Sequence, residues 1–392
     1  MANTIKFGNG NWAIKDGSTL AYNDENENFK PLPFDFSRAS NATAVNKEGL
    51  IEVLGSDMPK IDYLDNTKGA LLLEKTATNK VLYSNDLTQW ANIGSSTTVT
   101  NEGVSIVKNN TASRVQMTGS SYNSYLSGSV FCMAGTNHTF SFWAKGETAG
   151  LTFGVTYSGG SAPSYVTKTI ASDSDEWVKY EASFYSPGYL TVYYTFYNLQ
   201  NMDSVDFYVD GVQFEQVTTL DDSSTSLIET SGSAVSRVAD ECNGAGNEQV
   251  ISSTEGVLYV LLSDIKSKNF DSIIINNGIA DENNQVRIWF YNNTITYQYK
   301  VGSNVSAQIT TSAMDLTLDA KIACSWKLNE FKLFVNGSKI NQDLSGNVLA
   351  NNTLESVEFK RGNNTGNFYG NVKDVKVYDV ALTDQELADL TS

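Results

Sequence analysis

Several stretches of the chain alternate apolar and polar residues with the two-residue period of a β-strand. Residues 189–197 hold this alternation throughout, with tyrosine and threonine at the positions between the apolar ones. Shorter stretches with the same period lie at residues 140–144, 151–157, 178–184 and 205–209. After Gly211 the apolar set moves by one position, to Val212 and Phe214, which predicts a β-bulge at the glycine. Residues 91–217 are therefore predicted to form a β-sandwich.

Residues 251–392 show the same character and predict a second sandwich. Residues 256–262 are a continuous apolar run, typical of a buried strand. Further on, Val286, Ile288 and Phe290 alternate with Arg287, Trp289 and Tyr291. Asn292-Asn293 and Asn336-Gly337 predict tight hairpin turns, because these residues tolerate positive φ.

One short helix is predicted at the C-terminal end of the second sandwich. Thr383 can cap it, and Glu386, three residues later, completes a capping box. Leu382 and Leu387 occupy the hydrophobic staple positions, and Asp384 adds favourable charge near the helix N-terminus. Helix-favouring stretches are almost absent elsewhere, so the predicted fold class is all-β.

Two regions outside the sandwiches have a different character. Residues 1–90 hold three of the five prolines and only short apolar runs, which predicts a small N-terminal segment that needs a partner to bury itself. Residues 218–250 are rich in Ser, Thr, Gly and Asn and are predicted to be a linker.

Composition narrows the possible partners. The net charge of −17 argues against nucleic acid, which demands a basic patch, and against anionic lipid. No signal region and no membrane-spanning apolar run is predicted. Three widely spaced cysteines predict neither a disulfide framework nor a zinc cluster. Of these, Cys132 and Cys324 lie in apolar strand-like runs and are expected to be buried thiols.

The sequence offers little for catalysis. His138 is the only histidine, and no activated Ser or Cys motif accompanies it, so a nucleophile–His–acid triad is not expected. We expect His138 to be a partly buried structural residue, because it shares the alternation of residues 140–144. A glycosidase needs only two facing carboxylates, so that alternative stays open.

The C-terminal region resembles the laminin-G-type, concanavalin-A-like jelly roll. The residues that carry the resemblance are Trp326 and the runs 331–337, 368–378 and 381–387. This resemblance implies the fold and leaves the ligand undefined. The middle region is similar to the carbohydrate-binding-module-like jelly rolls of phage particles, on the strength of residues 207–215.

The N-terminal region resembles the opening of structural proteins from crAss-like and related tailed phages. The matching runs are residues 34–43, 46–52, 59–63, 71–74 and 236–240. The resemblance implies a virion protein, as a head fibre, tail fibre or decoration, whose residues 1–90 anchor it to other virion proteins. It also implies a homotrimer and synthesis in the host cytoplasm.

Two aromatic clusters are candidate glycan-binding sites. Tyr189, Tyr193 and Tyr197 share one strand face and could stack on sugar rings, although a contact between sheets or subunits is the reading we favour. Arg287, Trp289 and Tyr291 lie opposite the expected core face of the last domain. They could belong to a ligand surface, or pack inward if the phase of the strand is inverted.

Arg38 and Arg237 lie in two Ser-Arg motifs and are candidate structural anchors. Each could pair with a carboxylate such as Asp35, Asp62 or Asp240 and so hold the N-terminal segment to the linker. Each could equally be a separate local hydrogen-bond anchor.

Four acidic residues, Asp264, Asp271, Asp281 and Glu282, are weak candidates for a calcium site. No complete calcium-loop motif contains them, and solvated charges are the preferred interpretation, so no cofactor is expected.

Together these features predict a non-enzymatic virion structural protein that displays lectin-like domains and adheres weakly to bacterial surface glycans. Weak sites suffice when many copies are displayed, because later contacts become effectively intramolecular. The alternatives are a capsule depolymerase and a soluble lectin.

Overall fold

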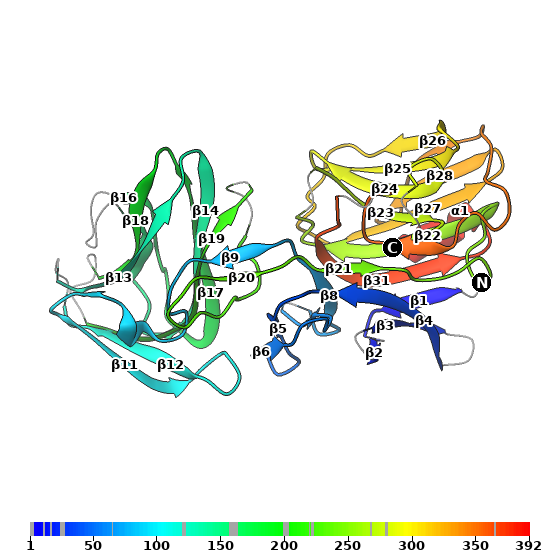
Figure 1. Ribbon diagram of the computed structural model, residues 1–392. Coiled ribbons are helices and arrows are strands. Elements are labelled where there is room, and N and C mark those ends of the chain that lie inside the picture. The colour runs from blue at the N-terminus through cyan, green and yellow to red at the C-terminus, as the bar shows by residue number, and fades with distance from the viewer. Residues whose placement is uncertain are drawn as a thin grey trace. The chain divides into compact units, whose positions relative to one another are not determined.

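The computed structural model shows an all-β protein with one short C-terminal helix, which confirms the predicted fold class (Figure 1). It describes residues 4–10, 12–15, 18–23, 28–64, 66–119, 123–156, 164–198, 204–218, 220, 223–266, 269–278, 281–363 and 366–392. The chain divides into two compact units. Unit 1 comprises Met1–Ser40, Leu54–Lys75 and Ala239–Ser392, and unit 2 comprises Asn41–Val53 and Thr76–Val238.

Unit 2 is a sandwich of two five-stranded antiparallel sheets. One sheet has the order β11 (Thr97–Val104), β12 (Thr111–Met117), β19 (Val205–Val217), β14 (Thr136–Gly146), β17 (Ser174–Ser186). The other has the order β10 (Asn92–Ile93), β13 (Tyr125–Cys132), β18 (Leu190–Tyr197), β15 (Thr152–Thr156), β16 (Ser164–Thr169). Smaller elements are β5 (Ala42–Val45) with β6 (Ile51–Leu54), β9 (Ala77–Asn79) with β20 (Val235–Arg237), and the 3₁₀ turn η1 (Leu87–Gln89).

The core of unit 2 is aromatic. Phe140 and Phe142 of β14 face Phe153 of β15 and Phe196 of β18, and all four are buried. The alternation of each strand places these rings on its inner face. Between β14 and β19 the register shifts opposite Gly211, whose φ is +57°, so the predicted bulge is confirmed.

Unit 1 also has two sheets, and all described strand pairings in them are antiparallel. The larger sheet runs β21 (Glu241–Asn243), β4 (Asn28–Ser37), β3 (Ser18–Asn23), β1 (Ile5–Gly8), β31 (Gly370–Tyr378), β22 (Glu255–Ser263), β27 (Ala320–Lys327), β28 (Glu330–Val335), β29 (Ser338–Asp343). Off this path, β2 (Ala13–Lys15) pairs with β3, and β7 (Ile61–Asp62) pairs with β8 (Ala70–Leu73), which pairs with β31. The smaller sheet runs β26 (Asn304–Thr310), β25 (Thr294–Val301), β24 (Gln285–Tyr291), β23 (Asn269–Asn276), β30 (Ser356–Glu358).

Buried aromatic side chains with satisfied polar ends fill the core of unit 1. Trp326 Nε1 donates to the carbonyl of Ser252 at 3.2 Å, and the Tyr299 hydroxyl donates to the carbonyl of Ser253 at 2.6 Å. These hydrogen bonds remove the cost of burying the polar atoms, so the rings contribute apolar area without an unpaired group.

The helix α1 (Asp384–Thr391) packs on the other face of the larger sheet, where Leu382 and Leu387 join a second apolar cluster. Thr383 and Glu386 form the predicted capping box. The Asn336-Gly337 turn joins β28 to β29 with φ values of +48° and +77°, as the hairpin signal predicts.

Residues 1–90 are divided between the two units and do not form a compact unit of their own. Strand β1 pairs with β31, with Ile5 opposite Val377, and Ile5 and Phe7 are fully buried in the core of unit 1. Residues 76–90 instead belong to unit 2. The physical reason is that a four-residue strand with two apolar side chains is most stable where a sheet edge and an apolar layer already exist.

The expected linker is likewise divided. Its part before residue 239 belongs to unit 2, where Leu227 and Ile228 are buried, and its later part adds Cys242 and Ala245 to the core of unit 1. Cys132, Cys242 and Cys324 are all buried free thiols. Among the described residues, no helix is long and apolar enough to cross a membrane.

Candidate functional site

The aromatic candidates Trp289 and Tyr291 lie on the outer face of the smaller sheet of unit 1. On β24, Val286, Ile288 and Phe290 point into the core, so the opposite side chains are directed away from it. Those outward side chains are Arg287, Trp289 and Tyr291. Tyr291 is 39% exposed and Trp289 is half-buried, but Arg287 is only 8% exposed. The predicted orientation of this strand is therefore confirmed, and the alternative, in which Arg287, Trp289 and Tyr291 pack into the core, is wrong.

Arg287 and Trp289 form one stacked pair on this face. The guanidinium carbon of Arg287 lies 4.7 Å from the centre of the Trp289 ring, and its Nε donates to Ser272 Oγ at 2.8 Å. Burial, followed by repulsion from Arg361, lowers the pKa of Arg287 to about 10, so the side chain remains a cation at neutral pH. Arg287 therefore covers one face of the Trp289 ring as a cation–π contact, and the indole remains partly exposed.

Two rows of polar side chains extend from this pair across the sheet. Arg287 lies opposite Gln298 of β25, which lies opposite Gln308 of β26, and Gln298 Nε2 donates to Gln308 Oε1 at 2.8 Å. Cross-strand partners share a sheet face, so these amides continue the surface that starts at Arg287.

The second row starts at Trp289. Its partner on β25 is Thr296, which in turn lies opposite Thr310 of β26. The two threonine hydroxyls are 3.0 Å apart. Trp289 and Gln298 are partly exposed and Gln308 and Thr310 are exposed, whereas Arg287 and Thr296 are only 8% and 4% exposed. The accessible part of the face therefore combines an aromatic ring, amides and a hydroxyl, groups that polar, ring-shaped ligands use.

Glu358 of β30 is a carboxylate on the same face. It lies across β23 from Arg287, because Ile274 pairs with both residues. It is almost completely buried and receives a hydrogen bond from Ser356 Oγ at 2.5 Å, while Lys360 Nζ lies at 3.2 Å. This carboxylate is therefore held by the protein's own groups.

The amides and threonines of β25 and β26 were missed by the sequence analysis. The sequence did contain the information needed to find them, because the turn at Asn292-Asn293 sets which residues of β24 and β25 lie opposite each other. Following that register from Arg287 would have reached Gln298.

The tyrosines of β18 do not form one open platform. Tyr189 precedes the strand and is 70% exposed, where its ring stacks on Phe131 with a centroid distance of 6.5 Å. Tyr193 is half-buried, and Tyr197 is only 5% exposed. Burial raises the pKa of Tyr197, consistent with a hydroxyl withdrawn from solvent. Spacing along a strand therefore predicts which side chains share a face, but not how far each of them is exposed to solvent.

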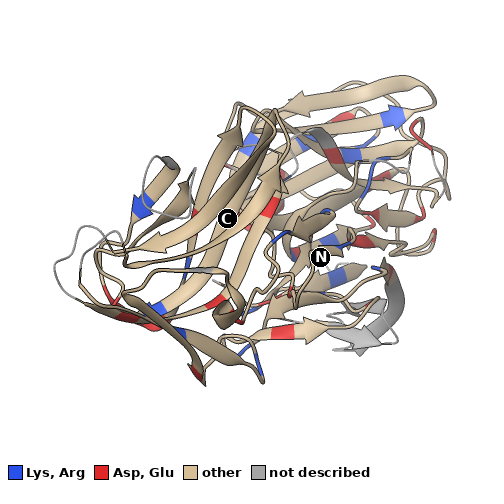
Figure 2. Ribbon diagram, turned by 60° about the vertical axis from the view of Figure 1, so that its left-hand side comes forward, with Lys and Arg blue, Asp and Glu red and all other residues tan. Residues whose placement is uncertain are grey.

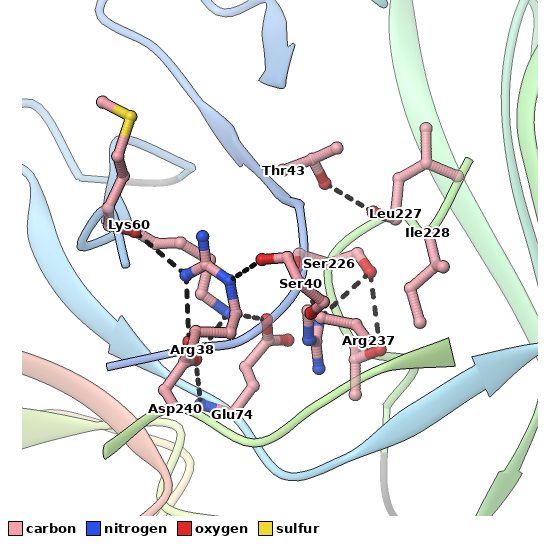
Figure 3. A network of polar contacts seen from close by, with 12 residues as sticks. Arg38, Ser40, Thr43, Lys60, Glu74, Ser226, Leu227, Ile228, Arg237 and Asp240 are labelled. Atoms are coloured by element: carbon pink, nitrogen blue, oxygen red, sulfur yellow. Dashed lines mark hydrogen bonds and ion pairs between the residues drawn. The ribbon is translucent and has the colours of Figure 1, made fainter. Parts of the chain in front are cut away.

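Arg38 is held in a buried polar cluster inside unit 1 (Figure 3). Its Nη1 lies 3.1 Å from Asp240 Oδ1, the other oxygen of which lies 2.8 Å from Lys60 Nζ. Lys60 also pairs with Glu74. Arg38 further donates to the carbonyls of Ser40, Met58 and Gly55 at 2.9, 3.0 and 2.6 Å. Asp240 was one of the three carboxylates that the sequence suggested as its partner.

Arg237 belongs to unit 2 and has a different environment. It is fully buried, and its Nη1 donates to Ser226 Oγ at 2.8 Å (Figure 3). On strand β20 it pairs with Ala77 of β9. The two Ser-Arg motifs therefore hold different parts of the chain, Arg38 through an ion pair and Arg237 through a serine.

The four acidic candidates for calcium are not gathered into a site. Asp264 pairs with Lys266 at 2.7 Å, Asp281 accepts from the backbone of Asn283 at 2.7 Å, and Glu282 pairs with Arg361 at 2.6 Å. Asp271 lies on β23 and is half-buried. In the part of the chain that the structure describes, no group of three or more His, Cys, Asp or Glu side chains is placed to hold a metal.

Basic and acidic residues are interspersed along the described ribbon (Figure 2). Several of them form ion pairs, for example Arg114 with Asp206 at 2.5 Å and Lys373 with Asp319 at 2.5 Å.

The strand order defines antiparallel β-sandwiches in both units. Residues 264–388 match the Laminin_G_3 family, described as the concanavalin A-like lectin/glucanases superfamily. The match supports a laminin G-like domain at the C-terminal end and includes the whole of strand β24. No curated protein matches the chain.

Solved structures show distant likeness to parts of the chain. They include the carbohydrate-binding module CBM40 of the Ruminococcus gnavus IT-sialidase, bound to α2,3-sialyllactose, at 16% identity and a TM-score of 0.32, covering 38% of this chain and 94% of that one. Another is a pentraxin of Limulus polyphemus, at 15% identity and a TM-score of 0.31, covering 36% and 71%. A third is domain 4 of a Geobacillus stearothermophilus arabinanase with arabinotriose, at 14% identity and a TM-score of 0.31, covering 39% and 73%. We draw no ligand for this chain from these scores.

Proposed function

We propose that this chain is a non-enzymatic structural protein of a phage particle that binds bacterial surface glycans through unit 1. The observation that carries the binding proposal is the Arg287–Trp289 pair with its two rows of amides and hydroxyls. Sugar rings offer apolar C–H faces to an aromatic ring and hydroxyls to amide and guanidinium groups. The match of residues 264–388 to a lectin-containing superfamily supports the same proposal.

The virion role rests on the resemblance of the runs at residues 34–74 and 236–240 to tailed-phage structural proteins. Each single site is expected to bind weakly, and display of many copies raises the effective concentration for the next contact. We propose a homotrimer as the assembly that displays these sites. Mass determination in solution at micromolar concentration would contradict the trimer by showing only the monomer.

A matched pair of tryptophan variants tests the glycan-binding face. Trp289 carries Arg287 over its ring at 4.7 Å, and Trp177 of unit 2 carries Lys145 over its ring at 5.0 Å. On a glycan array, the full chain with Trp289→Ala should lose at least about tenfold in affinity, or about 1.4 kcal/mol, whereas Trp177→Ala should retain wild-type binding. Equal loss in both variants would show that the face of β24 is not the site.

A second measurement separates adhesion from depolymerisation. The bound glycans are incubated with the protein and their chain length is followed by mass spectrometry. Unchanged length supports adhesion, and shortening that is lost in Glu358→Gln would overturn the non-enzymatic proposal. A cryo-EM reconstruction of the particle would test the virion role, which fails if the chain occurs only free in the lysate.

A further inference from the structure

Unit 2 exposes a group of large apolar side chains at one end of its sandwich. The β13–β14 connection and the β17–β18 connection meet there, and the backbone N–H of Gly135 donates to the carbonyl of Ser186, the last residue of β17, at 2.8 Å. Four side chains on or beside these connections are more than half exposed, and together they are called the end patch: Phe131 (56%), Met133 (52%), Tyr185 (52%) and Tyr189 (70%). Single exposed apolar side chains are ordinary on a protein surface, but a group of this kind marks a contact surface.

Strand pairing and ring stacking hold the end patch in place. Phe131 lies opposite Thr191 of β18, and its ring stacks on that of Tyr189 with centroids 6.5 Å apart and planes 19° from parallel. On β17, the hydroxyl oxygen of Tyr185 lies 4.0 Å from the position that a Cβ on Gly135 would occupy. The patch is therefore built on ordered strands, so little conformational entropy is lost when a partner covers it.

The segments that carry the end patch contain no charged residue. Residues 127–137 and 183–191 hold no Asp, Glu, Lys or Arg. Three other large apolar side chains of the described chain are more than 60% exposed, namely Val104, Leu318 and Leu344. Each of these three lies within two residues of an Asp or Glu. The end patch is thus distinguished by exposed apolar area without neighbouring carboxylates in sequence.

The absence of charge in these segments favours a second copy of this chain as the partner. Copies of a chain with a net charge of −17 repel one another, and like charges placed face to face cost several kcal/mol. A charge that does act on the buried thiol of Cys132, between Phe131 and Met133, is the cation of Lys80. Two copies can therefore meet at this end of unit 2 without placing the carboxylates of one against those of the other.

Composition and area also fit a contact between copies. Phe, Tyr and Met are enriched in the cores of protein interfaces, whereas Lys, Glu and Asp are depleted there. With about 200 Å² per large side chain, the exposed fractions of the end patch correspond to roughly 450 Å². That is about half of the roughly 800 Å² that each partner buries in a standard interface. The end patch therefore has the size of an apolar interface core that a polar rim surrounds.

Lipid and sugar fit the end patch less well. The net charge of −17 repels an anionic lipid surface. Phe131 and Met133 carry no hydrogen-bonding group, whereas a sugar site needs polar side chains placed beside its aromatic ring.

We propose that the end patch is a contact between copies of this chain, packing against the same patch of neighbouring copies. Around a symmetry axis the same residues of each copy meet, so one patch is sufficient to close the assembly. This inference rests on the proposed homotrimer and names the surface that forms it.

Sedimentation of the full chain and its variants at micromolar concentration tests the contact. Wild type should have three times the mass of one chain. Phe131→Asp and Tyr189→Asp each place one carboxylate per copy in the contact, so the concentration at which the assembly dissociates should rise at least about tenfold. Val104→Asp is the matched control, because Val104 is an exposed apolar residue of unit 2 outside the end patch, and this variant should assemble like wild type.

Two further measurements keep the test independent of folding and of charge. The Cys132 thiol should stay as protected from a thiol reagent as in wild type, because the replaced side chains are exposed. Tyr189→Ser introduces no charge and should weaken assembly in the same direction. Added salt screens the repulsion between copies and should strengthen the wild-type assembly, whereas weakening by salt would show an interface of ion pairs and overturn the proposal.

The possible failures are distinguishable. If wild type and both aspartate variants form the same trimer, the end patch is not the contact and this inference fails, while the proposed trimer stands. If wild type is only a monomer, the contact and the trimer both fail, while glycan binding at Trp289 is unaffected. If Tyr189→Asp loses binding to neutral glycans or to phosphatidylcholine vesicles without a change in oligomeric state, the end patch receives a ligand and the proposed contact is wrong.

Discussion

The buried cluster around Asp240 gives a sharp test of what holds unit 1 together. Its charged members, Arg38, Lys60, Glu74 and Asp240, sum to zero, and all four are buried. Asp240 is central because it touches both cations and also accepts from the backbone N–H of Glu74 at 2.8 Å. In Asp240→Asn the shape is preserved, but Arg38 loses its carboxylate partner and Lys60 keeps only Glu74. The new amide group is also a donor where an acceptor is needed.

The expected loss follows from the geometry. At 3.1 Å from Arg38 and 2.8 Å from Lys60, each attraction to Asp240 is about 5–6 kcal/mol before desolvation, with an effective dielectric constant of about 20. Desolvation of the charges offsets most of this in the intact cluster. Once the partner is removed, that desolvation is no longer compensated, so unit 1 should lose about 3–5 kcal/mol of unfolding free energy.

The native cysteines allow each unit to be followed separately. Cys242 and Cys324 are buried in the core of unit 1, and Cys132 is buried in the core of unit 2. A urea titration with short pulses of a thiol reagent, read by peptide mass spectrometry, gives an unfolding midpoint for each cysteine. The midpoint at Cys324 should fall sharply in Asp240→Asn.

Asp319→Asn is the matched control within unit 1. Asp319 pairs with Lys373 at 2.5 Å, but its side chain is 55% exposed, so its loss should cost no more than about 1 kcal/mol. Adding Lys60→Met to Asp240→Asn restores a neutral cluster and should recover part of the lost stability. Equal effects of Asp240→Asn and Asp319→Asn, or no recovery in the double variant, would refute the electrostatic reasoning.

Two further predictions concern pH and the helix. Burial, followed by the charge of Lys80, lowers the pKa of His138 from 6.5 to about 4, so the unfolded chain takes up this proton first and unit 2 loses stability as pH falls from about 6.5 to 4. His138→Phe should therefore remove up to about 3 kcal/mol of that acid-induced loss. Burial raises the pKa of Asp210 to about 6, so this residue makes unit 2 more stable as pH falls over part of the same range. The measurement is therefore the difference in the Cys132 unfolding midpoint between His138→Phe and wild type at each pH. Identical pH curves for the two proteins would contradict the assignment. Thr383→Ala removes the cap that accepts from the Glu386 backbone and should cost unit 1 about 1 kcal/mol at the Cys324 midpoint, whereas an unchanged midpoint would show that the helix adds no stability.

Local patterns predicted those features whose causes are local. The alternation around Arg287 identified the outward face of β24, because the pleat of a strand fixes which side chains share a side. The Asn336-Gly337 turn and the Thr383 capping box were equally readable, since each depends on residues within four positions.

Features that depend on distant pairing were not readable from one sequence. Ile5 pairs with Val377, and nothing in a four-residue apolar run specifies a partner at the other end of the chain. The burial of Tyr197 could not be predicted either, because the two-residue period of a strand tells which face a side chain is on and not what covers that face.

The N-terminal region, which was predicted to be a separate anchoring segment, is divided between the two units. The chain passes between the units four times, at residues 40–41, 53–54, 75–76 and 238–239. The cluster in unit 1 takes a residue from next to each passage: Arg38, the carbonyl of Gly55, Glu74 and Asp240. Residues beside all four passages are thus fixed to one another by buried charges and hydrogen bonds. Because β1 also completes the core of unit 1, residues 1–40 are structural parts of that unit. If the described part of residues 1–40 takes part in anchoring, it does so as part of folded unit 1.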